Sequence, residues 1–534
     1  MTSDYVAHDP SGDQWDVIVI GTGMGGSTIG YELARRGRRV LFLEKGKFLQ
    51  GTPVSARLPS PDDSEAQARI RTGHWPYPLE GRTSFGAVSF FAPMGCGSGG
   101  STLLYGAQLE RFAPSDFRPR ANFPNARDAN LPEQWPISYD DLLPFYRRAE
   151  SLFRVRGTPD PLNPDLGSSL REPPPFSDRD RALYDSFVGL GLHPYRAHTG
   201  FEFLENCAEC YEHCARNCKS DAGRICLLPA LSQHGARILP ECDVLNLAAD
   251  RTRVQAVRAR WLDREITLQA KVVVLSAGAF MTPLVLLNSR STEWPEGLAN
   301  RSGQVGGNLM LHTSDLVTVG QRELLSDVGP SKSMGLNDFY FDNGQKLGTF
   351  QKVGIPLLPG SILPYLRFSE IRDPRWWRPL LSPFLPLASE IASRWFRRSV
   401  LFATIVEDLP YADNRVLPAS GTRNGMRFEY RYAAELLRRN RYFRKRLVQT
   451  LSSRHPVHVV TGGMNNINYG HVCGTCRFGE DPRTSVLDAS NRAHDLDNLY
   501  VVDASFFPSS GGTNPSLTIA ANALRVGGII DARL

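Results

Sequence analysis

The sequence predicts an α/β protein in which a Rossmann-like, dinucleotide-binding domain is interleaved with a second domain. One observation is an apolar run, Asp16–Ile20, that leads into a glycine-rich turn and then into a helical pattern. Two further runs, Lys271–Leu275 and Asn498–Asp503, have the apolar character of strands buried in a parallel sheet. Because these runs come from the beginning, middle and end of the chain, separate segments must assemble the first domain.

The N-terminal unit has the order strand, helix, strand that is typical of a βαβ motif. After the first strand, the helical pattern runs from Ser27 to Arg36 and stops at Gly37. A second buried strand, Arg39–Leu43, follows and ends at Glu44. The unit has about the ~30 residues expected of such a motif.

The turn between the first strand and the helix carries a dinucleotide fingerprint. Gly21, Gly23 and Gly26 form the pattern G-x-G-x-x-G. Such glycines permit a tight turn, a close approach to a pyrophosphate and close packing of helix on strand. Glu44 follows Gly21 by 23 residues, where a carboxylate can accept ribose hydroxyls. The alternative is a glycine-rich turn without a ligand, and the fingerprint alone does not separate FAD from NAD.

The composition narrows the class of protein. The chain has 534 residues, enough for two or three structural units, and 41% hydrophobic with 22% charged residues indicates a globular protein. The net charge of +6 is scattered, so nucleic-acid binding is not expected. The first residues lack the pattern of a secretory signal, and no apolar stretch is long enough to cross a bilayer. We therefore expect a cytoplasmic protein, with peripheral membrane association or export with a partner as alternatives.

A series of motifs along nearly the whole chain resembles the glucose–methanol–choline (GMC) oxidoreductases. The similarity is greatest to bacterial FAD-dependent glucose, gluconate and fructose dehydrogenases, and it is weakest over about residues 320–455. The motifs that carry it are Gly99–Ala107, Arg111–Phe117, Trp135–Leu142, Leu275–Leu287, Val305–His312, His471–Pro482, Ser485–Asp488, Asn498–Pro508 and Asn514–Thr518.

The resemblance implies a division into domains. An FAD-binding domain would comprise residues 12–112, 200–312 and 470–534. A substrate-binding domain, built on an antiparallel sheet with helices, would comprise residues 113–199 and 313–469. The resemblance also implies the residues that contact FAD, namely Gly21, Gly23, Gly26, Glu44, Gly100, Ser101, Thr102, Ala277, Gly278, Asp503, Ala504, Asn514 and Pro515.

Two residues are candidates for the chemistry. Oxidising an alcohol removes a hydroxyl proton and a hydride from the same group, which calls for a base and for a partner that orients the oxygen. Neutral histidine suits the first role, and an amide, which both donates and accepts, suits the second. By resemblance, His471 falls on the catalytic histidine and Asn514 on the second catalytic position. An ordinary hydrogen-bonded histidine is the alternative for His471, and the other histidines, His312 among them, carry no comparable indication.

Four of the nine cysteines lie within twelve residues, at Cys207, Cys210, Cys214 and Cys218. Such spacing fits an iron–sulfur cluster, a zinc site, or free or disulfide-linked cysteines, and Cys226 could replace one ligand. The end of this Cys-rich loop, residues 205–226, is similar to the cluster-bearing segment of FAD glucose dehydrogenases. It differs in having no adjacent cysteines and in carrying Lys219 where those enzymes have proline. Cys473 and Cys476 also have redox-type spacing, but they belong to the family motif.

Residues 373–398 are rich in Trp, Arg and Pro. This composition fits a membrane-surface contact, a lid over an apolar substrate, or ordinary packing in the core.

Together these features predict an FAD-dependent alcohol dehydrogenase acting on a small-molecule alcohol. Electrons would leave through the cysteine-bound cluster to an external acceptor, such as an acceptor protein or cytochrome. The alternatives are an alcohol oxidase that uses oxygen, an electron-transfer flavoprotein without its own substrate, and a non-redox flavoenzyme of the same fold.

Overall fold

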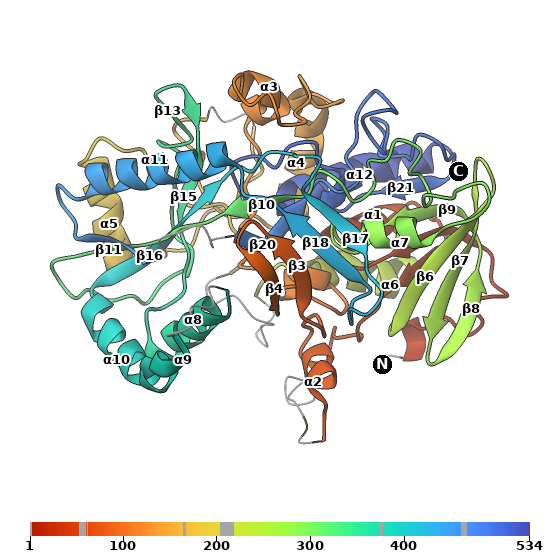
Figure 1. Cartoon of the computed structure of the whole chain (residues 1–534), viewed down its shortest axis with the longest axis horizontal. Helices are drawn as coiled ribbons and strands as arrows, with labels where there is room; N and C mark the ends of the chain where they lie inside the picture. The colour runs from red at the N-terminus through yellow and green to blue at the C-terminus, as the bar shows by residue number, and fades with distance from the viewer. Residues whose placement is uncertain are drawn as a thin grey trace.

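A five-stranded parallel sheet forms the centre of one half of the molecule (Figure 1). The computed structural model describes residues 3–52, 60, 62–163, 167–202, 218–372, 378–460 and 467–534. The predicted buried runs from the start, middle and end of the chain do join one sheet, which confirms the Rossmann-like fold. The strand order is β21-β9-β1-β2-β5, with β1 Trp15–Ile20, β2 Val40–Leu43, β5 Arg237–Leu239, β9 Ala270–Leu275 and β21 Leu499–Val501.

Alternating residues of β1 pack on opposite faces of this sheet. Val17 and Val19 belong to the apolar cluster that includes α1 and α12, whereas Ile18 and Ile20 belong to the cluster on the other face. Helix α1 packs against α12, and α12 packs against α4. The bounds are α1 Met24–Arg35, α4 Tyr139–Leu152, α6 Leu228–His234, α7 Thr282–Asn288 and α12 Ser516–Asp531.

The predicted helix after Trp135 begins at a capping box. The side chain of Ser138 accepts from the backbone N–H of Asp141 at 3.1 Å, and the Asp141 carboxylate accepts from the Ser138 N–H at 2.8 Å. Beside the parallel sheet stands a three-stranded antiparallel sheet of β6 Cys242–Ala249, β7 Val254–Trp261 and β8 Arg264–Leu268.

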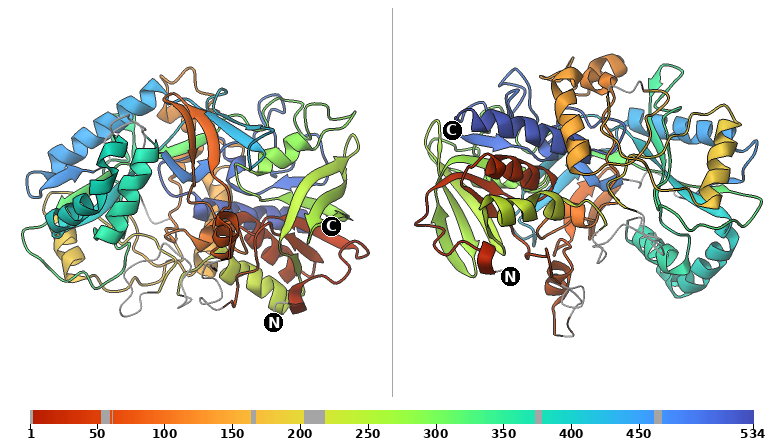
Figure 2. Two further views of the ribbon diagram at one scale, coloured as in Figure 1. Left: turned by 60° about the horizontal axis from the view of Figure 1, so that its bottom comes forward. Right: turned by 180° about the vertical axis from the view of Figure 1, so that it is seen from behind.

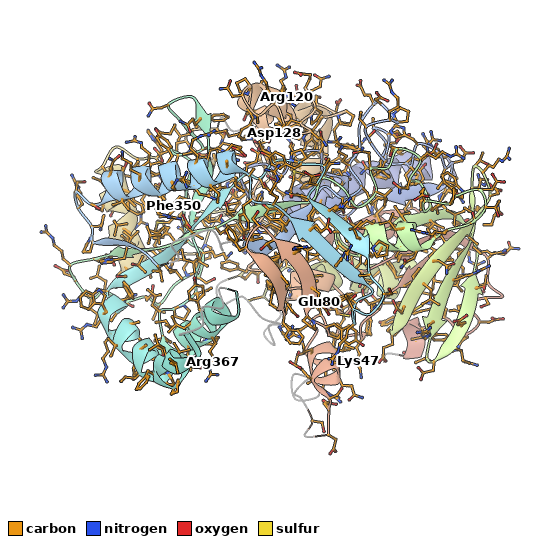
Figure 3. The ribbon with its side chains drawn as sticks, viewed as in Figure 1. Lys47, Glu80, Arg120, Asp128, Phe350 and Arg367 are labelled. Atoms are coloured by element: carbon orange, nitrogen blue, oxygen red, sulfur yellow. The ribbon has the colours of Figure 1, made fainter. Side chains whose placement is uncertain are left out.

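The other half of the molecule is built on a seven-stranded sheet whose pairs are antiparallel. Phe350, labelled in Figure 3, lies with Phe402 and Phe443 in the core between this sheet and the long helix α11. The strands are β10 Met310–Thr313, β11 Leu316–Gly320, β12 Gly335–Leu336, β15 Gly348–Lys352, β16 Ser399–Val406, β19 Val457–Val459 and β20 Ile467–Cys473, and α11 is Ala434–Leu451.

A four-stranded sheet between the halves joins segments that lie far apart in the sequence. Residues 51–100, which fall within the predicted FAD-binding domain, contain α2 Glu65–Arg71 and two strands that join β17 and β18. The interaction is long-range, and it depends on Gly81, because a Cβ there would lie 2.4 Å from the ring of Phe428. β3 also pairs with β4 in a local hairpin, but its sequence, Leu-Glu-Gly-Arg-Thr, lacks the apolar character that is typical of a buried strand. The strands are β3 Leu79–Thr83, β4 Gly86–Phe90, β17 Arg415–Pro418 and β18 Met426–Tyr430.

The remaining helices lie toward the surface. The group α8–α10 projects at the end of the molecule far from both chain termini (Figure 2). In the part of the chain that is described, none of the helices is long and apolar enough to cross a membrane. The bounds are α3 Pro119–Asn122, α5 Asp178–Val188, α8 Pro359–Arg372, α9 Arg378–Leu381 and α10 Leu385–Phe396, with a small hairpin of β13 Phe341–Asp342 and β14 Gln345–Lys346.

Candidate active site

A cavity of about 630 Å³ runs from the carboxyl edge of the parallel sheet to the antiparallel sheet. In open α/β sheets this edge is where ligands bind. Of the predicted cofactor and catalytic residues, only Gly26 does not line the cavity. The lining includes Gly21, Gly23, Glu44, Gly100, Ser101, Thr102, Ala277, Gly278, His471, Asp503, Ala504, Asn514 and Pro515.

The glycine fingerprint forms a cradle at the start of α1. Gly21 has φ +94°, and a Cβ there would lie 2.3 Å from the carbonyl oxygen of Ser276. A Cβ on Gly26 would lie 2.0 Å from the carbonyl oxygen of Gly21, so Gly26 serves close packing behind the cradle. At Gly23 nothing lies within 4 Å of the Cβ position, and this open space faces the cavity. The cradle therefore fits a pyrophosphate at the N-terminus of α1.

Glu44 lies at the end of β2, beside this cradle. Its carboxylate accepts hydrogen bonds from the backbone N–H groups of Thr22 at 3.1 Å and Gly46 at 2.8 Å. Burial raises the pKa of the carboxyl group, and the hydrogen bonds from Thr22 and Gly46 oppose that rise. A fixed carboxylate at this edge is suited to accept from ribose hydroxyls.

Asp503 connects the ends of two strands of the parallel sheet. One carboxylate oxygen accepts from the backbone N–H of Gly278 at 2.9 Å and from the hydroxyl of Thr282 at 2.5 Å. The other accepts from the backbone N–H of Ser505 at 2.8 Å. The side chain thus fixes the turns after β9 and β21, where Ala277 and Ala504 line the cavity.

The Cys-rich loop ends next to the cavity wall. Cys207, Cys210 and Cys214 lie outside the described residues, whereas Cys218 is buried. The neighbouring Lys219 is also buried, and its ammonium group donates to the carbonyl oxygens of Leu103 at 2.7 Å and Tyr105 at 3.2 Å. Within the described ranges, no group of three or more His, Cys, Asp or Glu side chains is arranged to hold a metal ion.

The other cysteines with candidate roles are buried thiols. Cys226 lies with its sulfur 3.7 Å from the hydroxyl of Thr28 on α1. Cys473 and Cys476 are free thiols, and burial raises the pKa of each well above its usual value.

His471 on β20 contacts a second histidine, His312 on β10. The Nδ1 atoms of the two rings are 2.9 Å apart, and the rings meet edge to face. Nε2 of His312 lies 2.9 Å from the carbonyl oxygen of Gly511 and 3.2 Å from that of Ser510. Since both of these partners are acceptors, Nε2 of His312 carries the proton.

The position of that proton fixes the state of His471. Burial lowers the pKa of His312 to about 4, so its ring is neutral near pH 7 and Nδ1 is an acceptor. His471 must then donate from Nδ1, which leaves the lone pair on Nε2. Burial, followed by the charges of His312 and Lys332, lowers the pKa of His471 well below its usual value. A neutral imidazole with a basic Nε2 results.

Asn514 lines the same cavity, just before α12. Its side chain is buried, and its amide oxygen has no hydrogen-bond partner within the described residues. An unpaired amide at this position is costly unless a ligand engages it. Asn514 is therefore arranged to contact a bound molecule and not to stabilise the loop.

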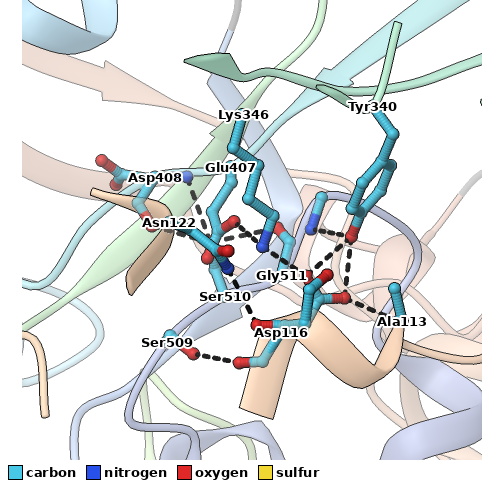
Figure 4. Close-up of polar contacts among 12 residues, drawn as sticks. Ala113, Asp116, Asn122, Tyr340, Lys346, Glu407, Asp408, Ser509, Ser510 and Gly511 are labelled. Atoms are coloured by element: carbon cyan, nitrogen blue, oxygen red, sulfur yellow. Dashed lines mark hydrogen bonds and ion pairs between the residues drawn. The ribbon is translucent and has the colours of Figure 1, made fainter. Parts of the chain in front are cut away.

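A buried charge cluster supports the loop that precedes Asn514 (Figure 4). Lys346 forms ion pairs with Asp116 and with Glu407, and all three side chains are fully buried. Tyr340 donates to Asp116 at 2.7 Å and accepts from the backbone N–H of Gly512 at 3.0 Å. Because the carbonyls of Ser510 and Gly511 in this loop accept the proton of His312, the cluster indirectly positions His312 and, through it, His471.

One face of the seven-stranded sheet forms the far wall of the cavity. Gln351 on β15 pairs with Ala403 on β16, which pairs with Leu316 on β11, and all three line the cavity. The amide oxygen of Gln351 and the hydroxyl of Ser314 are buried and have no hydrogen-bond partner within the described residues. Lys332 lies on this wall and contacts the amide oxygen of Gln108 at 3.4 Å.

The match to known families decides the identity of the site. Residues 16–314 match the N-terminal domain of GMC oxidoreductases, and residues 407–523 match the C-terminal domain. The chain belongs to the GMC oxidoreductase family. The GMC enzymes are FAD-binding flavoproteins. As a member of this family, the chain is an oxidoreductase.

Two curated relatives and one solved structure extend over nearly the whole chain. Paromamine 6'-oxidase from Streptomyces fradiae is 30% identical over 96% of this chain and 90% of its own length. 2-Methyl-1,2-propanediol dehydrogenase from Mycolicibacterium austroafricanum is 26% identical over 98% of this chain and 96% of its own length. The structure of a formate oxidase variant from Aspergillus oryzae superimposes with a TM-score of 0.65. It is 15% identical in sequence, and the match covers 98% of this chain and 99% of that chain.

Sequence reasoning missed His312 as a functional residue of this GMC site. It lies in the Val305–His312 motif, but nothing in that motif shows that β10 pairs with β20. Strand β10 pairs antiparallel with β20, with a register shift between Met310 and His312, and across this pair Nδ1 of His312 lies 2.9 Å from Nδ1 of His471.

Proposed function

We propose that this GMC oxidoreductase oxidises an alcohol CH–OH group to a carbonyl group, with His471 as the base. The observation that carries the proposal is the 2.9 Å contact between Nδ1 of His471 and Nδ1 of His312, in the same cavity as the unpaired amide oxygen of Asn514. A base of this kind can accept the hydroxyl proton near neutral pH.

The cavity fits FAD at one end and substrate at the other. The Gly23 cradle and Glu44 would hold the pyrophosphate and a ribose, while Ala277, Ala504 and His471 line the same cavity. FAD, when bound, supplies the two-electron acceptor for the hydride that leaves the alcohol carbon.

The chain's own residues handle the proton and the orientation. The hydroxyl proton of the substrate passes to Nε2 of His471, and the imidazolium charge is shared with His312 through the Nδ1 hydrogen bond. The amide N–H of Asn514 donates to the substrate oxygen while the carbon–oxygen bond becomes a double bond.

The far wall of the cavity, formed by the seven-stranded sheet, favours a substrate with several hydroxyl groups. A buried acceptor without a partner costs about 1–3 kcal/mol, and Gln351 and Ser314 both present such atoms. Additional hydroxyl groups on the substrate would satisfy them. Because Lys332 already disfavours a positive charge on His471, we further propose a neutral substrate over a cationic one.

A finer part of the proposal concerns where the electrons go. The spacing of Cys207, Cys210, Cys214 and Cys218 supports an iron–sulfur cluster and hence a dehydrogenase with an external acceptor. Lys219 attaches the end of that loop to the backbone of Leu103 and Tyr105, and Tyr105 lines the cavity. Iron and acid-labile sulfide analysis of anaerobically purified protein, compared with Cys214→Ser, tests this part. Zinc or no metal in iron-replete preparations would reject it and leave the oxidase as the better proposal.

Rapid reduction of the bound flavin by candidate alcohols tests the main proposal. His471→Ala should retain FAD yet lower the rate of flavin reduction by about 10²–10⁴-fold. A normal rate in this variant, with a substrate that the wild type oxidises, would show that His471 is not the base.

A further inference from the structure

Exposed apolar side chains gather on one short stretch of the second half of the molecule. Among the residues that the structure describes, fifteen large apolar side chains are exposed, and six of these lie between positions 380 and 395. Their exposed fractions range from 49% to 73%, and they are Leu380, Leu381, Phe384, Leu387, Ile391 and Trp395. Single exposed apolar residues are ordinary, but a cluster of this density marks an interaction surface.

Helix α10 carries apolar residues on two sides. Ser389 is its one buried residue, and on that side the ring of Phe396 packs 5.7 Å from the ring of His458. A spacing of four residues places a second apolar stripe along the helix, away from this contact. This outer stripe consists of Leu387, Ile391 and Trp395.

The outer stripe is flanked by positive charge. Between positions 380 and 398 there are three arginines, Arg394, Arg397 and Arg398, against one acid, Glu390, and all four side chains are exposed. Arginine heads contact lipid phosphates while tryptophan rings sit at the boundary between headgroups and acyl chains. The combination complements the anionic surface of a bilayer.

The cavity does not use this surface. None of the described residues of α8, α9 and α10 lines the cavity, which argues against a lid, and the exposure of the outer stripe argues against core packing. The helices project at one end of the molecule, where Arg367 of α8 also lies (Figures 1 and 3). Helix α10 has 12 residues, whereas a spanning helix needs about 20.

We propose that the surface formed by residues 380–398 binds an anionic lipid bilayer, with α10 lying in the plane of the interface. Val353 lines the cavity, and α8 begins six residues later, at Pro359. The bilayer would therefore lie beside the substrate end of the cavity. This inference is independent of the reaction proposed above.

Flotation with lipid vesicles tests the inference, using the full-length flavoprotein. We expect binding to vesicles of mixed phosphatidylcholine and phosphatidylglycerol, and weaker binding to phosphatidylcholine alone. The triple variant Leu387→Ser/Ile391→Ser/Trp395→Ser should bind roughly tenfold less or worse, because the apolar contact is lost. Arg394→Gln/Arg397→Gln should reduce the preference for the anionic vesicles and its sensitivity to salt.

The matched control is Leu324→Ser/Val328→Ser, which removes two exposed apolar side chains outside the surface and should bind as the wild type does. Retained flavin absorbance and unfolding temperature show that the triple variant is folded. Absence of vesicle binding by the wild type, or unchanged binding by the folded triple variant, overturns the inference. So does a concentration-dependent dimer that the triple variant abolishes, because the surface would then be an interface between two copies.

Discussion

Nδ1 of His312 lies 2.9 Å from Nδ1 of His471, and the protein backbone decides which ring carries the shared proton. The carbonyl oxygen of Gly511 accepts a hydrogen bond from Nε2–H of His312. The proton between the two rings is therefore carried by Nδ1 of His471. In the proposed mechanism His312 is a positioning residue, because it acts on the reaction through the tautomer of His471.

Substitutions at His312 should separate tautomer control from mere packing. His312→Gln can still accept from His471 and donate to Gly511, whereas His312→Leu can do neither. We expect His312→Leu to lower the rate of flavin reduction by about 10–10³-fold, since His471 would lose the acceptor that fixes its tautomer and orientation and that stabilises its protonated form. His312→Gln should recover most of that rate. Equal losses in both variants, with FAD still bound, would show that His312 only fills space.

The rate of substrate oxidation should begin to fall at a lower pH than it would with a histidine of ordinary pKa as the base. The pKa of His471 is lowered below the usual 6.5, chiefly by burial. The neutral base therefore persists as the pH falls, and kcat/KM should decline only below pH 6.5. Lys332 contributes to this lowering, so Lys332→Met should raise the pKa of His471 and move the decline to higher pH. Lys332→Arg, which keeps the charge, is the control, and an unshifted profile in Lys332→Met would contradict the assignment.

Stability should also respond to the buried neutral ring of His312. Its pKa is 6.5 when exposed and about 4 in the fold, so the unfolded chain binds the extra proton between these values. The free energy of unfolding should therefore rise with pH across this window and fall as the pH is lowered. Urea titrations at several pH values should show a shallower slope in His312→Gln.

Gln351 provides a test of the substrate class. Gln351→Leu keeps the volume but removes the unpaired acceptor on the cavity wall. KM for a polyhydroxylated substrate should rise about tenfold, corresponding to one lost hydrogen bond, while KM for a simple alcohol should stay the same. Gln321→Leu is the matched control, because Gln321 also has an unpaired buried oxygen but does not line the cavity. Equal changes for both kinds of substrate would argue against a polyhydroxylated ligand.

How far the sequence predicts this molecule depends on how local each signal is. The fingerprint from Gly21 to Glu44 lies within one short segment, and the parallel strands can be recognised as apolar runs. The strand Leu79–Thr83 is not such a run, because its residues are mostly polar; it pairs with Gly86–Phe90 in a hairpin and with Met426–Tyr430 more than three hundred positions later. His312 has no local sequence signal either, because its contact with His471 arises only where β10 pairs with β20.

Lys346 offers the sharpest test of how the loop that precedes Asn514 is held in place. Its ammonium group stands between the carboxylates of Asp116 and Glu407, 2.5 Å from the latter, with no exposure to solvent. Lys346→Met would leave two buried carboxylates without their cation and should lower the free energy of unfolding by about 3–5 kcal/mol.

The consequence should extend from stability to catalysis. Tyr340 links Asp116 to the backbone of Gly512, so a disturbed cluster would displace the carbonyls that fix the proton on His312. The triple variant Lys346→Met/Asp116→Asn/Glu407→Gln removes the charges together and should recover much of the stability, because no unpaired charge remains. Denaturant unfolding measures the first effect, and flavin reduction by substrate measures the second. If Lys346→Met unfolds as the wild type does, the cluster is not what holds the loop before Asn514.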